Sequence, residues 1–146
     1  MIQRVFVVDT NIVVAGLITS APQSPTALIL DAMLKGNMAF LLSPELLSEY
    51  RNVLLRPKIA RIHNLNMDEV EQVLVEITAN ALWREANQDI RHPCPDPGDS
   101  HLWALLGSEP SAIMITGDQL PIDNPRPGSS VISPAAWLAH FSGLSG

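Results

Sequence analysis

Near its start the sequence changes from apolar to polar within a few residues, which read Val5-Phe6-Val7-Val8-Asp9-Thr10-Asn11. An unbroken β-branched and aromatic run is typical of a strand buried on both faces of a parallel sheet. Asp9 follows at the carboxyl end of that strand. Ligands of open α/β sheets bind at this edge, because strand ends and helix N-termini meet there. Asp9 is therefore a candidate site residue, although an aspartate after a strand more commonly forms a turn or caps a helix.

Further apolar runs predict the rest of the sheet. Residues 39–42 and 113–116 resemble the first run, and residues 81–84 and 131–132 are weaker strand candidates. Helices are expected where a capping side chain precedes proline, because the first helical position needs no N–H. Four pairs fit this pattern: Ser24-Pro25, Ser43-Pro44, Asp96-Pro97 and Ser133-Pro134. The alternation predicts an α/β fold of three α/β/α layers with a mostly parallel central sheet.

Several segments between the strands are also predicted in outline. An apolar stripe over residues 43–56 predicts a helix that Pro57 ends, and residues 67–80 repeat the pattern with an acidic outer face. The proline-rich segment 121–128 is expected to be a surface loop. Without a repeat or a linker, residues 1–146 are expected to form a single domain.

Composition narrows the class of protein. The chain has 146 residues, 47% of them apolar, and its one cysteine cannot form an internal disulfide, which favours a cytoplasmic location. No apolar run approaches about 20 residues, so no membrane span is expected. The net charge of −6 argues only weakly against nucleic acid as a partner, because acids can gather around a cation.

Two more acids stand at informative places. Asp118 follows the apolar run at 113–116 after one turn residue, so it also belongs at a strand carboxyl end, unless it merely caps a helix. Glu49 lies in mid-helix, where no capping role exists, at about 40° around the helix axis from Val53. That angle turns Glu49 inward, although a boundary residue paired with Arg51 or Arg56 is an equal alternative.

The motif Asp96-Pro97-Gly98-Asp99 supplies the remaining acids. Asp96 suits the N-cap of a helix, and Asp99 suits the third position of a capping box. Asp99 also precedes Leu102 by three residues, which aims its carboxylate along the buried face of the helix. Capping and ligation are compatible roles for this motif.

Together these acids predict a cation site. Carboxylates that converge to about 5 Å repel by roughly 3 kcal/mol per pair at an effective dielectric constant of 20. Because the ligands are all oxygens, the expected neutralising ion is Mg²⁺ or Mn²⁺. Such an ion stabilises charge on a phosphoryl oxygen and activates water, which points to hydrolysis of phosphodiesters.

The motifs resemble those of the PIN domain family, nucleases that include the VapC-type toxins of toxin–antitoxin systems. The resemblance extends from Val5 to about Phe141. Four pieces carry it: Val8-Asp9-Thr10-Asn11, the segment from Ser43-Pro44-Glu45 through Glu49 to Lys58, Asp96-Pro97-Gly98-Asp99, and Thr116-Gly117-Asp118 with Leu120. It implies Mg²⁺- or Mn²⁺-dependent cleavage of RNA, often by homodimers that an antitoxin protein inhibits.

The resemblance assigns a role to each matching residue. Asp9, Glu49, Asp99 and Asp118 would form the catalytic quartet. Asp9, Asp99 and Asp118 would be the metal ligands, and Glu49 would hold or deprotonate the attacking water. Three more residues match accessory positions, with Asn11 and Thr116 orienting the acids and Asp96 acting as an accessory acid and cap.

Other residues depart from the pattern or lie beside it. Many relatives carry a further acid directly after the position of Asp99, where this chain has Ser100 and His101. A histidine in a first helical turn more often faces solvent than touches substrate, so His101 is expected to be exposed. Arg51 and Arg56 begin a basic window that ends at Arg61. This window either contacts RNA phosphates or pairs with the acidic face at 68–76.

Two other functions compete with a nuclease. A phosphatase of the haloacid-dehalogenase type also places an aspartate after its first strand, but it needs an acid where this chain has Asn11 and a late lysine that this chain lacks. A PIN-like module could instead bind RNA or protein without catalysis. The intact quartet argues against that alternative.

Overall fold

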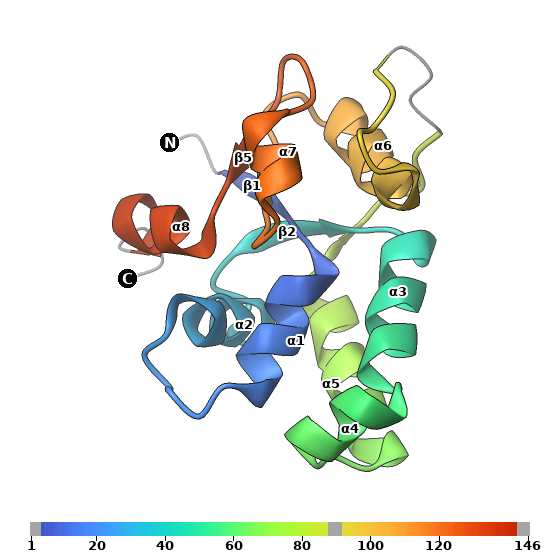
Figure 1. Cartoon of the computed structure of the whole chain (residues 1–146), viewed down its shortest axis with the longest axis vertical. Helices are drawn as coiled ribbons and strands as arrows, with labels where there is room; N and C mark the ends of the chain where they lie inside the picture. Colours follow the sequence, from blue (N-terminus) through green and yellow to red (C-terminus); the bar gives the residue numbers. More distant parts are fainter. Residues whose placement is uncertain (1–3, 88–91, 143–146) are drawn as a thin grey trace.

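A parallel five-stranded sheet forms the centre of the molecule. The computed structural model describes residues 4–87 and 92–142 (Figure 1). The strands lie in the order β3-β2-β1-β4-β5, and every neighbouring pair is parallel. Their bounds are β1 Val5–Val8, β2 Ala39–Leu42, β3 Leu82–Trp83, β4 Ile113–Ile115 and β5 Ser130–Ile132. All five predicted strands are therefore present.

Helices cover both faces of this sheet. In Figure 1, α2 and α5 lie on one side of β1 and β2, and α6 lies on the other, so the predicted three-layer α/β/α fold is confirmed. The helices are α1 Thr10–Ile18, α2 Pro25–Lys35, α3 Pro44–Leu54, α4 Pro57–His63, α5 Met67–Asn80, the 3₁₀ turn η1 Pro97–Asp99, α6 Ser100–Ser108, α7 Gln119–Asp123 and α8 Pro134–His140.

Three of the four predicted capping pairs begin an α-helix. The hydroxyls of Ser24, Ser43 and Ser133 each accept a hydrogen bond from a backbone N–H in the first turn of α2, α3 and α8. The fourth pair differs, because Asp96-Pro97 opens the 3₁₀ turn η1, and α6 begins only at Ser100. A 3₁₀ turn is a common lead-in to an α-helix.

One prediction about proline is confirmed and another is wrong in part. Pro57 follows the end of α3 as predicted, and it also begins α4, where Arg56 is the N-cap without any side-chain hydrogen bond. Proline alone therefore suffices to start this helix, because its backbone is already in the helical range. Segment 121–128 is not entirely a surface loop, because α7 extends to Asp123 and Pro121 is buried.

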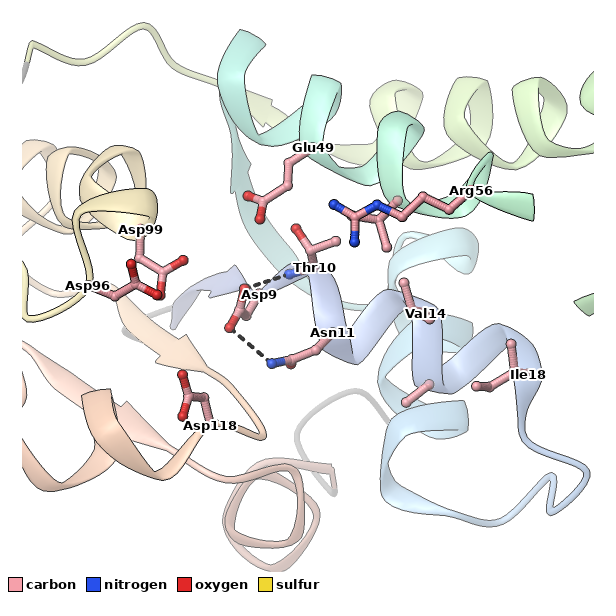
Figure 2. Close-up of a pocket in the computed structure, with 12 residues that line it drawn as sticks. Asp9, Thr10, Asn11, Val14, Ile18, Glu49, Arg56, Asp96, Asp99 and Asp118 are labelled. Atoms are coloured by element: carbon pink, nitrogen blue, oxygen red, sulfur yellow. Dashed lines mark hydrogen bonds between the residues drawn. The ribbon is translucent and has the colours of Figure 1, made fainter. Parts of the chain in front are cut away.

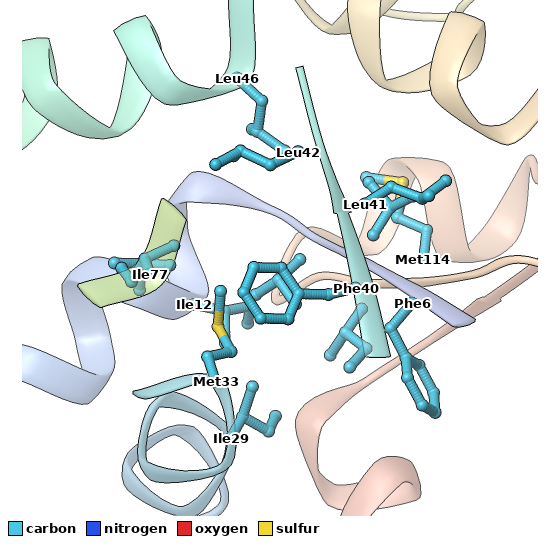
Figure 3. Close-up of a cluster of buried hydrophobic side chains, with 14 of the residues drawn as sticks. Phe6, Ile12, Ile29, Met33, Phe40, Leu41, Leu42, Leu46, Ile77 and Met114 are labelled. Carbon is cyan, nitrogen blue, oxygen red and sulfur yellow. The ribbon is translucent and has the colours of Figure 1, made fainter. Parts of the chain in front are cut away.

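The core fills the space between the sheet and the helices. Val7, Phe40 and Met114 of the three central strands are fully buried. Phe40 packs in the same cluster as Met33 of α2 and Ile77 of α5 (Figure 3). This packing fixes α2 and α5 against β2, since a dense interior leaves few alternative arrangements.

The helices are short compared with a membrane-spanning segment. Within the described ranges, none of the helices is long and apolar enough to cross a bilayer. The longest, α5, has 14 residues and carries acids in its first turn.

The strand order places a ligand-binding crevice at one position. From β1 the chain proceeds outward to β2 and β3, and it then returns to the other side of β1 to form β4 and β5. Strand order therefore reverses between β1 and β4. Crevices outside the carboxyl ends of the strands at such a reversal are the usual ligand sites of open α/β sheets.

Candidate active site

A pocket of about 450 Å³ opens at the reversal between β1 and β4. All four acids of the predicted quartet line it: Asp9, Glu49, Asp99 and Asp118. Figure 2 shows these side chains directed toward one central space from α3, η1 and the ends of β1 and β4. Residues that are 109 positions apart in sequence, Asp9 and Asp118, thus share one cavity.

Asp9 is held more firmly than the other acids. Its side chain is buried, with 6% of the residue exposed. Oδ1 accepts a hydrogen bond from the N–H of Thr10 at 2.8 Å, and Oδ2 accepts one from the hydroxyl of Thr116 at 2.7 Å. Burial raises the pKa of Asp9, the bonds from Thr116 and Thr10 lower it, and the charges of Glu49 and Asp118 raise it again. The fold thus supplies donors to a carboxylate that burial disfavours.

Thr116 and Asn11 link the two strand ends behind the pocket. The Thr116 hydroxyl donates to Asp9 and also accepts a hydrogen bond from the N–H of Asp118 at 3.0 Å. Asn11 Nδ2 donates to Asp9 Oδ2 at 3.3 Å, and Asn11 Oδ1 accepts from the N–H of Gly117 at 3.3 Å. These bonds fix the position of Asp118 relative to Asp9. Asp118 itself caps α7 by accepting from the N–H of Leu120 at 3.2 Å.

Glu49 reaches the pocket from α3, which is tied to β1. Tyr50, the next residue, is completely buried and donates its hydroxyl to the carbonyl oxygen of Val8 at 2.5 Å. Because Val8 precedes Asp9, this bond sets the helix that carries Glu49 against the strand that carries Asp9. The inward orientation predicted for Glu49 agrees with its place in the pocket wall.

The partner of Glu49 is His101. His101 Nε2 lies 2.7 Å from Glu49 Oε2, and this contact is the largest cause of a lowered pKa of Glu49, with smaller contributions from Thr10 and Arg56. The expectation that His101 faces solvent was wrong, because only 18% of its side chain is exposed. The first turn of α6 faces α3 here, and a single sequence cannot reveal that packing.

Asp96 and Asp99 line the pocket from the α6 side. Asp96 Oδ1 accepts a hydrogen bond from the N–H of Gly98 at 3.0 Å and so caps η1. The predicted capping box is not formed, because α6 begins only at Ser100, so that Asp99 is its N-cap residue, and the side chain of Asp99 makes no capping bond. Burial, together with the charges of Asp9, Asp96 and Glu49, raises the pKa of Asp99 to about 6.

The two arginines proposed for substrate binding, Arg51 and Arg56, lie in different places relative to the pocket. Arg51 points away from the pocket and pairs with Glu71 of α5 at 2.8 Å, as the alternative for the basic window predicted. Arg56 instead lines the pocket beside Glu49. Of the two, only Arg56 is in a position to meet a ligand there (Figure 2).

Thr10 is a pocket residue that the sequence did not single out. It is 5% exposed and lines the pocket, and its Oγ1 is buried with no hydrogen bond of good geometry. It nevertheless contributes to the low pKa of Glu49. The only feature of the sequence that could have indicated a role for Thr10 is its position between Asp9 and Asn11.

The acids share a pocket but do not form a closed ligand shell. Across residues 4–87 and 92–142, no three carboxylate, histidine or cysteine side chains are close enough to hold a metal ion in their present positions. The donor chemistry nevertheless fits a hard cation, since the available ligands are carboxylate oxygens. Like charges across the pocket also add to the raised pKa of Asp99, whose largest cause is burial.

Comparison of the sequence with known proteins identifies the family to which the chain belongs. A family model described as PIN domain matches residues 5–120. No curated protein and no solved structure gives a significant match. PIN domains are generally nucleases that use divalent metal ions. The matched segment contains both strand ends, Glu49 and the Asp96–Asp99 turn, and the chain belongs to the PIN domain family.

Proposed function

We propose that this PIN domain is an endoribonuclease that hydrolyses RNA phosphodiesters with Mg²⁺ or Mn²⁺. One observation carries the proposal: acids from four separate parts of the chain line a single pocket at the strand-order reversal. Carboxylates gathered in this way repel one another, and a divalent cation removes that cost. The matched family supports a nuclease of this general kind.

The metal ligands in this proposal are Asp9, Asp99 and Asp118. When bound, Mg²⁺ or Mn²⁺ supplies positive charge that stabilises phosphoryl oxygens and lowers the pKa of a water molecule. Asp9 is presented by Thr10 and Thr116, whose hydrogen bonds favour the ionised carboxylate. Asp96 lines the pocket as an accessory acid and caps the turn that carries Asp99.

Glu49 and Arg56 act on the reactants. Glu49 is ionised at neutral pH, and its carboxylate accepts a hydrogen bond or a proton from the attacking water. Arg56 lies beside it on the exposed side of the pocket and binds a phosphate of the RNA. Water attack at phosphorus then leaves a 5′-phosphate and a 3′-hydroxyl.

The biological setting is a separate part of the proposal. The resemblance to VapC-type toxins suggests a cytoplasmic toxin that an antitoxin protein inhibits and that acts as a homodimer. Such a toxin arrests growth when it is produced alone. Growth of a bacterial host after induction of the wild type, compared with induction of Asp9→Asn, tests this role.

The proposal is tested by incubating the purified protein with a mixed pool of single-stranded and structured RNA. Wild type is expected to cleave with Mg²⁺ or Mn²⁺ and to stop with a chelator, and Asp9→Asn is expected to be inactive while remaining folded. Asp31→Asn is a matched control, because Asp31 is an exposed acid of α2 outside the pocket.

Three results would contradict the proposal. Cleavage that survives Asp9→Asn or the chelator would show contamination or another mechanism. RNA binding without cleavage by the wild type would favour a non-catalytic module. Release of inorganic phosphate from monoesters, with a phosphoenzyme at Asp9, would favour a phosphatase.

A further inference from the structure

The Glu49–His101 contact crosses between two helices that carry different parts of the pocket. Glu49 belongs to α3, and His101 belongs to α6, directly after the turn that carries Asp99. His101 Nε2 and Glu49 Oε2 are 2.7 Å apart, and the two side chains are 18% and 33% exposed. The two atoms do not meet with the geometry of a good hydrogen bond, and partial burial of this kind makes their close ion-pair contact more effective than it would be in open solvent.

The pair stands between two cavities. Glu49 lines the acidic pocket of about 450 Å³, whereas His101 lines a second cavity of about 230 Å³ with Ser43 and Ser100. His101 therefore contacts Glu49 from the side of the second cavity and is not among the residues that line the acidic pocket. A ligand in that pocket would meet Glu49 but not His101.

Glu49 needs an external partner if it is to keep one orientation. A glutamate side chain has several rotatable bonds, and an unrestrained one on a helix surface samples many rotamers. The backbone of α3 is fixed by the hydrogen bond from Tyr50 to Val8, but this bond does not restrain the carboxylate of Glu49. The restraint on the carboxylate itself comes from His101, with Thr10 contributing beside it.

We propose that His101 is a positioning residue that holds the Glu49 carboxylate in the pocket for RNA cleavage. The inference rests on the proposed nuclease function and extends it to a residue outside the acidic quartet. His101 touches neither substrate nor metal and acts only through Glu49. Removing its contact should therefore slow the chemical step and leave RNA binding nearly unchanged.

The test compares substitutions that remove or retain an N–H donor. His101→Leu lacks the donor and keeps most of the side-chain volume, whereas His101→Gln keeps an N–H near the same place. His101→Leu is expected to lower kcat by about 10- to 100-fold, the usual effect of losing such a supporting contact, with KM changed by less than about threefold. His101→Gln should restore most of the activity. His140→Leu is the matched control, because His140 is exposed on α8.

A double substitution shows whether His101 acts through Glu49. In the Glu49→Gln background, His101→Leu should have no further effect on the residual rate, since a residue that acts only through its neighbour is silent once that neighbour is gone. The thermal unfolding midpoints of both single variants and the double variant should be non-additive for the same reason. Those midpoints also show that each variant is folded.

The outcomes separate this inference from the proposed function. If the wild type does not cleave RNA with either metal, the proposed function fails and the inference fails with it. If the wild type cleaves and His101→Leu is equally active, only the inference is overturned. It is also overturned if His101→Leu remains harmful in the Glu49→Gln background, if KM rises in place of a fall in kcat, or if His101→Gln is as impaired as His101→Leu.

Discussion

The two sides of the acidic pocket are built differently. On the β1–β4 side, which we define as Asp9, Asn11, Thr116 and Asp118, hydrogen bonds connect every side chain to a neighbour. On the α6 side, defined as Asp96 and Asp99, Asp96 caps its own turn and Asp99 makes no capping bond. The first side is organised by the protein alone. The second side carries an electrostatic cost that a cation would relieve.

The largest effect is expected on the β1–β4 side, at Thr116. Thr116→Val removes a fully buried hydroxyl and leaves both Asp9 Oδ2 and the N–H of Asp118 without that partner. Stability should fall by about 1–3 kcal/mol, the usual cost of leaving a buried polar group unsatisfied, and RNA cleavage should fall with it. Chemical denaturation measures the loss. Thr116→Ser keeps the hydroxyl and should remain close to wild type, and equal stability of Thr116→Val would contradict this account of Asp9.

A smaller loss is expected where α3 is tied to β1. Tyr50→Phe retains the buried ring but removes the hydrogen bond to the Val8 carbonyl. We expect about 1 kcal/mol of destabilisation, measured by denaturant unfolding, and a lower kcat because Glu49 is less well placed against Asp9. An unchanged unfolding free energy together with unchanged activity would mean that this bond does not set the geometry of the pocket.

On the α6 side, a substitution is expected to raise the stability of the protein, whereas Thr116→Val and Tyr50→Phe are expected to lower it. The pKa of Asp99 in the folded protein, about 6, lies above the ordinary value of 3.8, so the folded state binds more protons than the unfolded state between these values. The stability contribution of Asp99 therefore decreases as pH rises from about 4 to 6, and the full cost of its ionised form remains at pH 7. Asp99→Asn should stabilise the metal-free protein at pH 7 and have no such effect near pH 4.

The size of this effect is modest because Asp99 is only partly buried. Solvent screens its charge, so we expect about 1 kcal/mol rather than the full conversion of the pKa shift, or about 3 °C in the unfolding midpoint. Mg²⁺ should raise the midpoint of the wild type at pH 7 but should have little effect on Asp99→Asn. A lower midpoint for metal-free Asp99→Asn at pH 7 would show that the carboxylate contributes favourably and needs no cation.

The smallest effect on stability is expected among the basic residues. Arg51→Gln breaks an exposed ion pair with Glu71 and should leave both the unfolding midpoint and RNA cleavage unchanged. Arg56→Gln should also leave the midpoint unchanged, but it should raise KM for RNA severalfold because Arg56 lines the pocket. Equal KM values for the two variants would remove Arg56 from the proposed substrate contacts.

The sequence predicted the β1–β4 side of the pocket better than the α6 side. Asp9 and Asp118 follow apolar strands, and the meeting of parallel strand ends at one edge is a general property of such sheets. Glu49 could be placed because the helical period turns it toward the apolar stripe of α3. These inferences depend on local patterns that a single chain displays.

What the sequence could not predict depends on packing between distant segments. His101 meets Glu49 because the start of α6 lies against α3, and Tyr50 meets Val8 although 42 positions separate them. The capping box predicted at Asp99 failed for a local reason, since a 3₁₀ turn precedes α6 and moves Asp99 from the third helical position to the N-cap position of α6. Neither kind of information is present in residue spacing alone.

The central claim is that the acidic pocket binds a divalent cation between its two sides. The most direct measurement is an anomalous difference map from crystals of the wild type grown with Mn²⁺. We predict a peak in the pocket, coordinated by Asp9 together with Asp99, Asp118 or both, and no peak in crystals of Asp9→Asn. A pocket without Mn²⁺ in the wild type at saturating concentration, or Mn²⁺ bound only elsewhere on the protein, would contradict the account.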